Sequence, residues 1–250
     1  MRFDIITLFP DWVRSVAQYG IAQRALARGL FSLHTWNPRD WGAGVHRAVD
    51  DRPYGGGPGM VMQYAPLAAA LAAARADDAQ PMYTVALTPQ GRPLRQAMFQ
   101  EALGHGRLAL VCGRYEGMDE RFLATEVDAE WSLGDFVLSG GELAAMAVLD
   151  GCVRLLPGAL GHVDSALQDS FAREGLLDCP HYTRPEVVAG RSVPEVLLGG
   201  HHAEIARWRR REALGRTLER RPDVLAGLNL SPEDSALLDE YRGLRKHGED

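Results

Sequence analysis

The residues best suited to chemistry in this sequence gather in glycine-rich turns that follow apolar runs. The segment 131–142 contains an apolar run that ends in Ser-Gly-Gly at 139–141 and leads into a helix-like stretch. Adjacent glycines let a backbone approach a ligand closely or adopt positive φ, because no Cβ stands in the way. The runs that end at Leu87 and Cys112 lead into similar turns, 88–91 and 113–117. If these strands are parallel neighbours, their turns meet at the carboxyl edge of one sheet, where open α/β sheets bind ligands.

Two other features could be functional or merely structural. Arg154 lies within the apolar segment 151–156. An unpaired buried charge is costly, so this arginine should face a partner or a cleft, and a structural ion pair is the alternative. The run 55–59 is dense in glycine, but it lacks the Lys-Ser/Thr of a P-loop and the G-x-G-x-x-G spacing. A turn without a ligand is the alternative there.

Composition is ordinary for a soluble globular protein of one large or two modest domains, with 46% hydrophobic and 24% charged residues among 250. No stretch is long enough to span a membrane, and the N-terminus does not have the pattern of a secretory signal. The three cysteines are odd in number and widely spaced, which favours reduced thiols in the cytoplasm.

The order of apolar patterns predicts an α/β domain, a linker at about 158–170 and a small helical domain. Strands are expected at 3–8, 31–36, 82–88, 107–112 and within 130–139, with a long loop at 42–60. Helices are expected at 11–27, 66–75, 93–103, 118–125, 142–155, 192–198, 201–220 and 232–246.

The charge distribution leaves a nucleic-acid partner open. The net charge of −6 argues against such a partner, but seven arginines fall between His201 and Arg221. A local basic patch can bind phosphates although the whole chain is acidic. The alternative is a solvated helix face with i,i+4 ion pairs.

The chain resembles the bacterial tRNA (guanine-N1)-methyltransferases of the SPOUT class over nearly its whole length. The resemblance rests on the motifs 3–10, 50–60, 113–117, 131–142 and Asp169-Ser170-Phe171. It implies an α/β domain over 1–160 whose parallel sheet ends in a trefoil knot, a flexible linker over 161–172 and a helical tRNA-binding domain over 173–250. The knot comes from the resemblance alone, because connection rules argue against knots.

The resemblance also implies an activity, the transfer of a methyl group from S-adenosylmethionine to N1 of the guanine 3′-adjacent to the anticodon, position 37. Asp169 would be the general base, although an aspartate there can also be a helix N-cap. Arg154 would be catalytic, and Glu116 would lie near the reacting centre. The implied methyl-donor residues are Leu87, Pro89, Gly113, Tyr115, Leu133, Gly134, Phe136, Leu138, Gly140 and Gly141. The implied substrate contacts are Asp50, Arg52, Gly59, Ser170 and Phe171, with Arg207 and Arg210 on the basic helix.

The implied partners are the tRNA anticodon stem-loop and a second copy of the chain, with the active site between the two protomers. Magnesium is implied, but the sequence contains no magnesium motif. The cysteine and histidines around Cys179-Pro180-His181 match no standard zinc spacing. The chain has Ala144 and Gly199 where family members often have proline and serine. Neither change removes a proposed catalytic group.

Other functions remain as alternatives. Another SPOUT methyltransferase, acting on a ribose 2′-hydroxyl or a different base, would share the donor pocket but lack the 50–60 and 169–171 motifs. A non-catalytic RNA-binding protein is disfavoured by Glu116, Arg154 and Asp169 occurring together. A nicotinamide-dependent oxidoreductase is disfavoured by the missing dinucleotide fingerprint.

Overall fold

The computed structural model describes residues 1–161, 169–172 and 175–247. Of residues 246 and 247 it describes the backbone only. The chain divides into two units, Met1–Val163 and Asp164–Asp250. The first unit has two apolar clusters, one on each side of its sheet, and the second unit has a cluster of its own. None of the described helices is long and apolar enough to cross a membrane.

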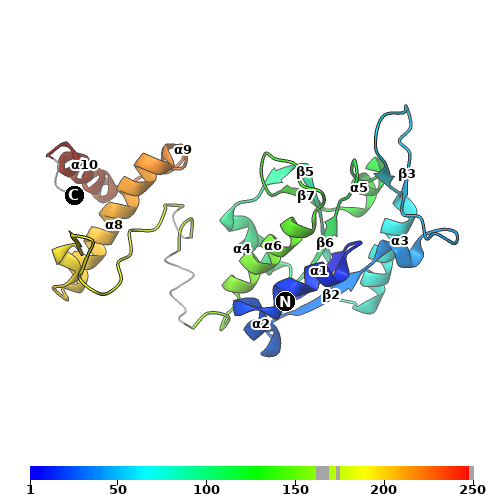
Figure 1. Ribbon diagram of the computed structural model, residues 1–250, viewed down its shortest axis with the longest axis horizontal. Coiled ribbons are helices and arrows are strands. Elements are labelled where there is room, and N and C mark those ends of the chain that lie inside the picture. Colours follow the sequence, from blue (N-terminus) through cyan, green and yellow to red (C-terminus); the bar gives the residue numbers. More distant parts are fainter. Residues whose placement is uncertain (162–168, 173–174, 248–250) are drawn as a thin grey trace. The chain divides into compact units, whose positions relative to one another are not determined.

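A five-stranded parallel sheet forms the centre of the first unit (Figure 1). Its strands lie in the order β2 (Ser32–Trp36), β1 (Arg2–Ile6), β6 (Arg107–Cys112), β5 (Tyr83–Pro93) and β7 (Ala129–Ser132). Every neighbouring pair is parallel. The three strands that precede the glycine-rich turns, β5, β6 and β7, are therefore parallel neighbours. Their turns meet at one edge of the sheet, as the sequence analysis expected for such strands.

Helices cover both faces of this sheet, which is why its central strands are continuously apolar. One face packs against α1 (Pro10–Arg14), the 3-10 helix Ser15–Gln18, α2 (Gly20–Ala27), α4 (Gln96–Gly104) and α6 (Glu142–Leu155). The other face packs against α3 (Tyr64–Asp77) and α5 (Glu120–Glu126). Along β6, Leu108 and Leu110 point to the first face, and Ala109 and Val111 point to the second.

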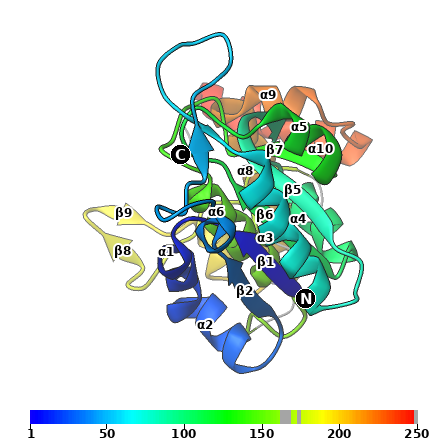
Figure 2. The same ribbon diagram turned by 90° about the vertical axis from the view of Figure 1, so that its right-hand side faces the viewer.

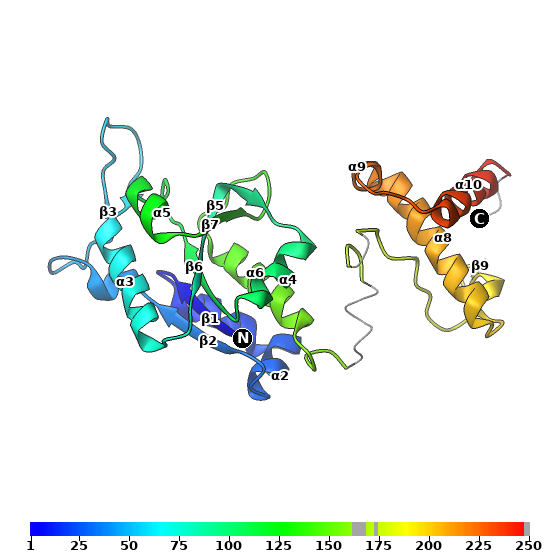
Figure 3. The same ribbon diagram turned by 180° about the vertical axis from the view of Figure 1, so that it is seen from behind.

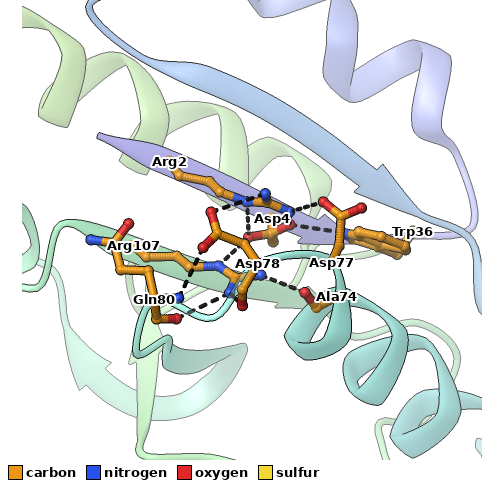
Figure 4. A network of polar contacts seen from close by, with 8 residues as sticks. All are labelled: Arg2, Asp4, Trp36, Ala74, Asp77, Asp78, Gln80 and Arg107. Atoms are coloured by element: carbon orange, nitrogen blue, oxygen red, sulfur yellow. Dashed lines mark hydrogen bonds and ion pairs between the residues drawn. The ribbon is translucent and has the colours of Figure 1, made fainter.

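A buried ion-pair network ties β1 and β6 to the end of α3 (Figure 4). Asp4 and Arg107 are both fully buried, and Arg107 Nε donates to Asp4 Oδ2 at 2.9 Å. The same guanidinium donates to the backbone carbonyls of Ala74, Asp78 and Gln80 at the carboxyl end of α3. Arg107 thus pairs with a buried carboxylate and also donates hydrogen bonds to carbonyl groups that the end of a helix leaves without partners.

Several predicted elements of the first unit are confirmed, and three need correction. The strand at 107–112 and the helix at 142–155 have the predicted bounds. The helix predicted over 11–27 is broken, because Tyr19 is extended and Gly20 has a φ of 64°. The strand expected within 130–139 ends at Ser132, and the rest of that segment is a loop.

The third correction concerns β5, which continues to Pro93 instead of ending near residue 88. Its pairing with β7 shifts register between Leu87 and Arg92. A Cβ at Gly91 would lie 2.5 Å from the backbone of Glu130 and Trp131. Only glycine therefore allows β5 to approach β7 again after the shift. The loop predicted over 42–60 contains the short strand β3 (Asp50–Asp51), which pairs with β4 (Val61–Met62), and the 3-10 helix Pro38–Trp41 precedes this loop.

The second unit is largely helical among its described residues. It contains α8 (His202–Arg220), α9 (Pro222–Ala226) and α10 (Pro232–His247) (Figure 3). The helix predicted near 192–198 is wrong: β9 (Arg191–Ser192) pairs with β8 (Val187–Val188), and only a 3-10 turn, Glu195–Leu197, follows (Figure 2). Residues 162–168 of the predicted linker lie outside the described residues.

Candidate active site

A cavity of about 490 Å³ opens at the carboxyl edge of the sheet, where β5, β6 and β7 end. Its wall comes from the three turns that the sequence analysis identified, together with Ala144 of α6 and with Glu120 and Leu123 of α5. All ten residues expected to hold a methyl donor line this cavity: Leu87, Pro89, Gly113, Tyr115, Leu133, Gly134, Phe136, Leu138, Gly140 and Gly141. Glu116 lines it as well.

Backbone segments approach one another closely at the floor of the cavity. Gly141 N donates to Gly113 O at 2.9 Å, which joins the β7–α6 loop to the turn after β6. A Cβ at Gly141 would lie 2.9 Å from Cys112 Cα and 3.2 Å from Leu87 Cβ. The glycine is therefore required by the crossing of these segments, and the same crossing shapes the cavity.

A buried carboxylate fixes the loop that covers this floor. Glu142, in the first turn of α6, is fully buried and accepts hydrogen bonds from Thr7 Oγ1 at 2.9 Å and Arg114 Nε at 3.0 Å. Arg114 also donates to Ser139 O at 3.0 Å, and its guanidinium lies 4.4 Å from the centre of the Phe9 ring. Glu142 and Arg114 thus hold the 133–141 loop against the sheet edge.

Sequence reasoning missed this pair. A usable signal was present in the sequence. Arg114 comes two residues after the apolar run of β6, and a charge so close to a buried strand needs a partner. Burial, with a contribution from Glu142, raises the pKa of the neighbouring Cys112 thiol. Cys112 is therefore a core residue rather than a nucleophile.

The turn after β6 also contacts the 50–60 loop. Glu116 N donates to Met60 O at 2.9 Å, and a Cβ at Gly59 would lie 2.3 Å from Glu116 Oε1. Gly59 is thus packed against Glu116, at the side of the cavity. Arg52 is exposed in the same loop.

Tyr115 connects Asp50 to the cavity. Its φ is 60°, a left-handed conformation uncommon for a residue with a Cβ. Burial and the nearby Asp50 carboxylate raise the pKa of the Tyr115 phenol, although Arg39, at 3.5 Å from the hydroxyl, opposes this. The phenol stays protonated at neutral pH and is available as a hydrogen-bond donor.

The remaining catalytic candidates do not line the cavity. Arg154 is half-buried in the last turn of α6. It lies about 18 Å from Glu142 along the helix axis at the usual rise per residue. Asp169 belongs to the second unit, where it is exposed. Within the first unit, Glu116 therefore lines the cavity and Arg154 does not.

The Asp169-Ser170-Phe171 segment is anchored within the second unit. Ala172 N donates to Asp169 O at 3.2 Å, and Phe171 N donates to Leu176 O at 2.7 Å. Ser170 Oγ accepts a hydrogen bond from the backbone of Asp178 at 2.9 Å. Phe171 has a φ of 64°, and the Arg221 guanidinium lies 5.7 Å from the centre of its ring. These contacts determine the backbone conformation next to Asp169.

The two arginines expected to bind tRNA are engaged in ion pairs. Arg207 donates two hydrogen bonds to Glu240, and Arg210 donates two to Asp234. Both acids belong to α10, so the pairs join helices instead of running i,i+4 along α8. Hydrogen bonds from Arg207 and Arg211 outweigh partial burial and lower the pKa of Glu240 to about 2.

One group of possible metal ligands occurs among the described residues. Asp178, the buried Cys179 and His181 have ligand atoms within 4.8 Å of one another. His181 Nε2 already lies 2.8 Å from Asp178 Oδ2, and burial raises the pKa of the Cys179 thiol to about 11. A sulfur, nitrogen and oxygen set does not suit magnesium, which prefers oxygen ligands. The described side chains therefore offer no magnesium cluster of this kind.

The fold and the cavity together define an α/β protein with a cavity at the carboxyl edge of a parallel sheet, where α/β proteins commonly bind ligands. Comparison with known proteins then gives its class. The family model described as tRNA (guanine-1)-methyltransferase TrmD matches residues 1–227. This chain belongs to the tRNA (guanine-1)-methyltransferase family.

The chain is similar along its length to curated members of that family. It is 57% identical over 242 residues to the tRNA (guanine-N(1)-)-methyltransferase of Methylococcus capsulatus, covering 97% of this chain and 96% of that one. It is 55% identical over 241 residues to the proteins of the same name from Pseudomonas fluorescens and Pseudomonas putida, covering 96% of both chains in each case. The expected family and enzyme class are thus confirmed.

Proposed function

We propose that this enzyme methylates N1 of the guanine 3′-adjacent to the anticodon, position 37, in tRNA. The observation that carries the proposal is the cavity at the sheet edge, which is lined by all ten predicted donor-binding residues and by Glu116. Its leucine side chains suit an adenine ring, and its glycines leave backbone polar groups accessible. When bound there, S-adenosylmethionine would supply an electrophilic methyl group.

The chemistry requires a base, because neutral guanine carries a proton on N1. Asp169 accepts that proton as N1 bonds to the methyl carbon and the bond of that carbon to sulfur breaks, which would release S-adenosylhomocysteine. While the proton leaves, negative charge develops toward O6, and Arg154 stabilises it, an effect worth about 3–4 kcal/mol when the hydrogen-bond donor is preorganised. Glu116 lies beside Gly59 at the cavity wall, where it can contact the target base. The guanine must leave its stack to reach the cavity.

We further propose that two protomers share the active site, because these groups belong to different units of the chain. Glu116 lines the cavity of the first unit, whereas Asp169 belongs to the second. In a homodimer, Asp169 of one protomer would meet the cavity of its partner. We further propose the trefoil knot at the cavity, the helical unit as the tRNA-binding domain and a cytoplasmic location, which a tRNA substrate supports. The family resemblance adds magnesium, to which we assign no ligand and no step.

The test is methyl transfer from labelled S-adenosylmethionine to a tRNA transcript with two guanines at the 3′ edge of the anticodon. We expect 1-methylguanosine from the wild type and almost none from Asp169→Ala, with donor binding unchanged in both. Equal product from the variant would remove Asp169 as the base. A methylated ribose or another base as product would instead favour a different RNA methyltransferase.

A mixing experiment tests the shared site. Asp169→Ala and Glu116→Ala proteins are each expected to be nearly inactive, and co-expression should restore activity. If each site takes one residue from each protomer, random pairing leaves about a quarter of the sites intact. Failure to recover any activity, with mixed dimers demonstrated by affinity tags, would place both residues in one protomer's site.

A further inference from the structure

The arginines of α8 fall into two groups. Arg207, Arg210 and Arg211 form ion pairs with Glu240, Asp234 and Glu212. Arg209, Arg216 and Arg220 form no ion pair or side-chain hydrogen bond with any residue that the structure describes. The first group holds α8 against α10, and the second group is left for another role.

The second group lies on one face of the helix. Arg209 and Arg216 are seven residues apart, and Arg220 follows four residues later. At 3.6 residues per turn these spacings align, so the three side chains form a single row about 16 Å long. Arg207 and Arg211 are four residues apart on a different face, the one that meets α10. We call Arg209, Arg216 and Arg220 the arginine row.

Nearby acids do not neutralise the row. Glu212 receives hydrogen bonds from Arg211 at 2.9 and 3.2 Å. Glu219 accepts a hydrogen bond from Tyr241 at 2.9 Å and pairs with Arg245 at 3.2 Å. Arg209 and Arg220 are exposed and Arg216 is half-buried. The row is therefore a line of positive charge on an otherwise acidic chain.

Each end of the row adjoins a feature suited to RNA. At one end, Arg209 lines a cavity of about 660 Å³ together with Tyr182 and Trp208. Tyr182 is 48% exposed, and the centre of its ring lies 6.4 Å from that of the Trp208 ring. The exposed ring can stack with an unpaired base. Arg184 and the acid Glu186 also line this cavity.

At the other end, Arg220 precedes Arg221, whose guanidinium lies over Phe171. Phe171 is two residues from Asp169, the base in the proposed function. An RNA strand bound along the arginine row would therefore run from the aromatic cavity to the segment that contains Asp169.

We propose that the arginine row binds the phosphate backbone of the tRNA substrate, with Tyr182 as a stacking surface at its end. The proposal rests on the proposed function and replaces Arg207 and Arg210 as the tRNA contacts. Arginine favours phosphate because its planar fork can donate two hydrogen bonds at once. An aromatic ring beside such charges is typical of sites for unpaired nucleotides.

The test compares two variants of the full-length protein, Arg209→Gln/Arg216→Gln/Arg220→Gln and the control Arg207→Gln/Arg210→Gln. Binding to a labelled tRNA transcript is measured across a series of salt concentrations. Each lost phosphate contact should reduce the slope of log affinity against log salt by about 0.7–0.9. We therefore expect the row variant to lose about 2–3 from the slope, with its melting temperature and S-adenosylmethionine affinity unchanged. The control should retain the wild-type slope and melt at a lower temperature.

A third variant separates charge from shape. Replacement of the three row residues by lysine should keep the slope, because the positive charges remain. An unchanged slope in the glutamine variant, or an equal loss in the control, would overturn the proposal. Failure of the proposed function looks different: the wild type would then bind tRNA with the full slope but yield no 1-methylguanosine.

Discussion

At the scale of single residues, the buried carboxylate of Glu142 decides how the cavity is formed. It accepts from Thr7 at the end of β1 and from Arg114 after β6, and Arg114 in turn holds Ser139. Three segments distant in sequence thus depend on one side chain. Because Glu142 is fully buried, any polar partner left without it is costly.

We predict that Glu142→Gln weakens donor binding and lowers stability. The substitution keeps the shape but removes the charge that Arg114 faces, at a cost of about 1–3 kcal/mol. Thermal unfolding and calorimetric titration with S-adenosylmethionine would measure both effects. Arg121→Gln is the matched control, because its pair with Asp119 is largely exposed on the arginine side and should contribute little to stability. Wild-type affinity and melting temperature in Glu142→Gln would contradict this role.

At the scale of elements, the site depends on the crossing of the β7–α6 loop and the turn after β6. We predict that Gly141→Ala disrupts the cavity, because the new Cβ would lie 2.9 Å from Cys112 Cα with only backbone and Leu87 around it. The backbone shift should cost about 1–3 kcal/mol and reduce donor affinity. Gly104→Ala in α4 is the control: a Cβ there meets nothing within 4 Å, and alanine favours helix by up to about 1 kcal/mol. Equal effects of the two substitutions on S-adenosylmethionine titration would rule out the crossing as the cause.

Elements that depend on local pattern were predictable from the sequence, and those that depend on distant partners were not. The apolar run of β6 predicted the bounds of that strand, and the Ser-Gly-Gly and Pro157-Gly158 segments on either side of α6 predicted the bounds of that helix. The register shift at Gly91 arises because β5 packs against β7, which lies about forty residues later in the sequence. The residues around Gly91 alone therefore do not predict it. The roles of the α8 arginines were undecidable for the same reason, because Glu240 and Asp234 select which of them form ion pairs.

At the scale of the whole molecule, each unit carries its own acid-sensitive contact. In the first unit, burial disfavours the Asp4 carboxylate, but hydrogen bonds from Arg2, Trp36 and Arg107 outweigh it and lower its pKa. In the second unit, Arg207 lowers the pKa of Glu240 to about 2 from 4.5. A carboxylate with a lowered folded pKa contributes stability that is present above its unfolded pKa and is lost as pH falls toward the folded value.

We therefore predict constant stability from these groups between pH 5 and pH 8 and a loss that begins below about pH 4.5. The loss should occur in both units, because Asp4 ties β1 to β6 and Glu240 ties α10 to α8. Urea unfolding at pH 7, 4 and 3, followed by hydrogen exchange in peptides from β1 and α10, measures the units separately. Glu240→Gln should weaken α10 at pH 7 and flatten the pH dependence of that unit alone, since β1 keeps its own ion pair. If the α10 peptide of the variant showed the wild-type pH dependence, Glu240 would not be the group that titrates.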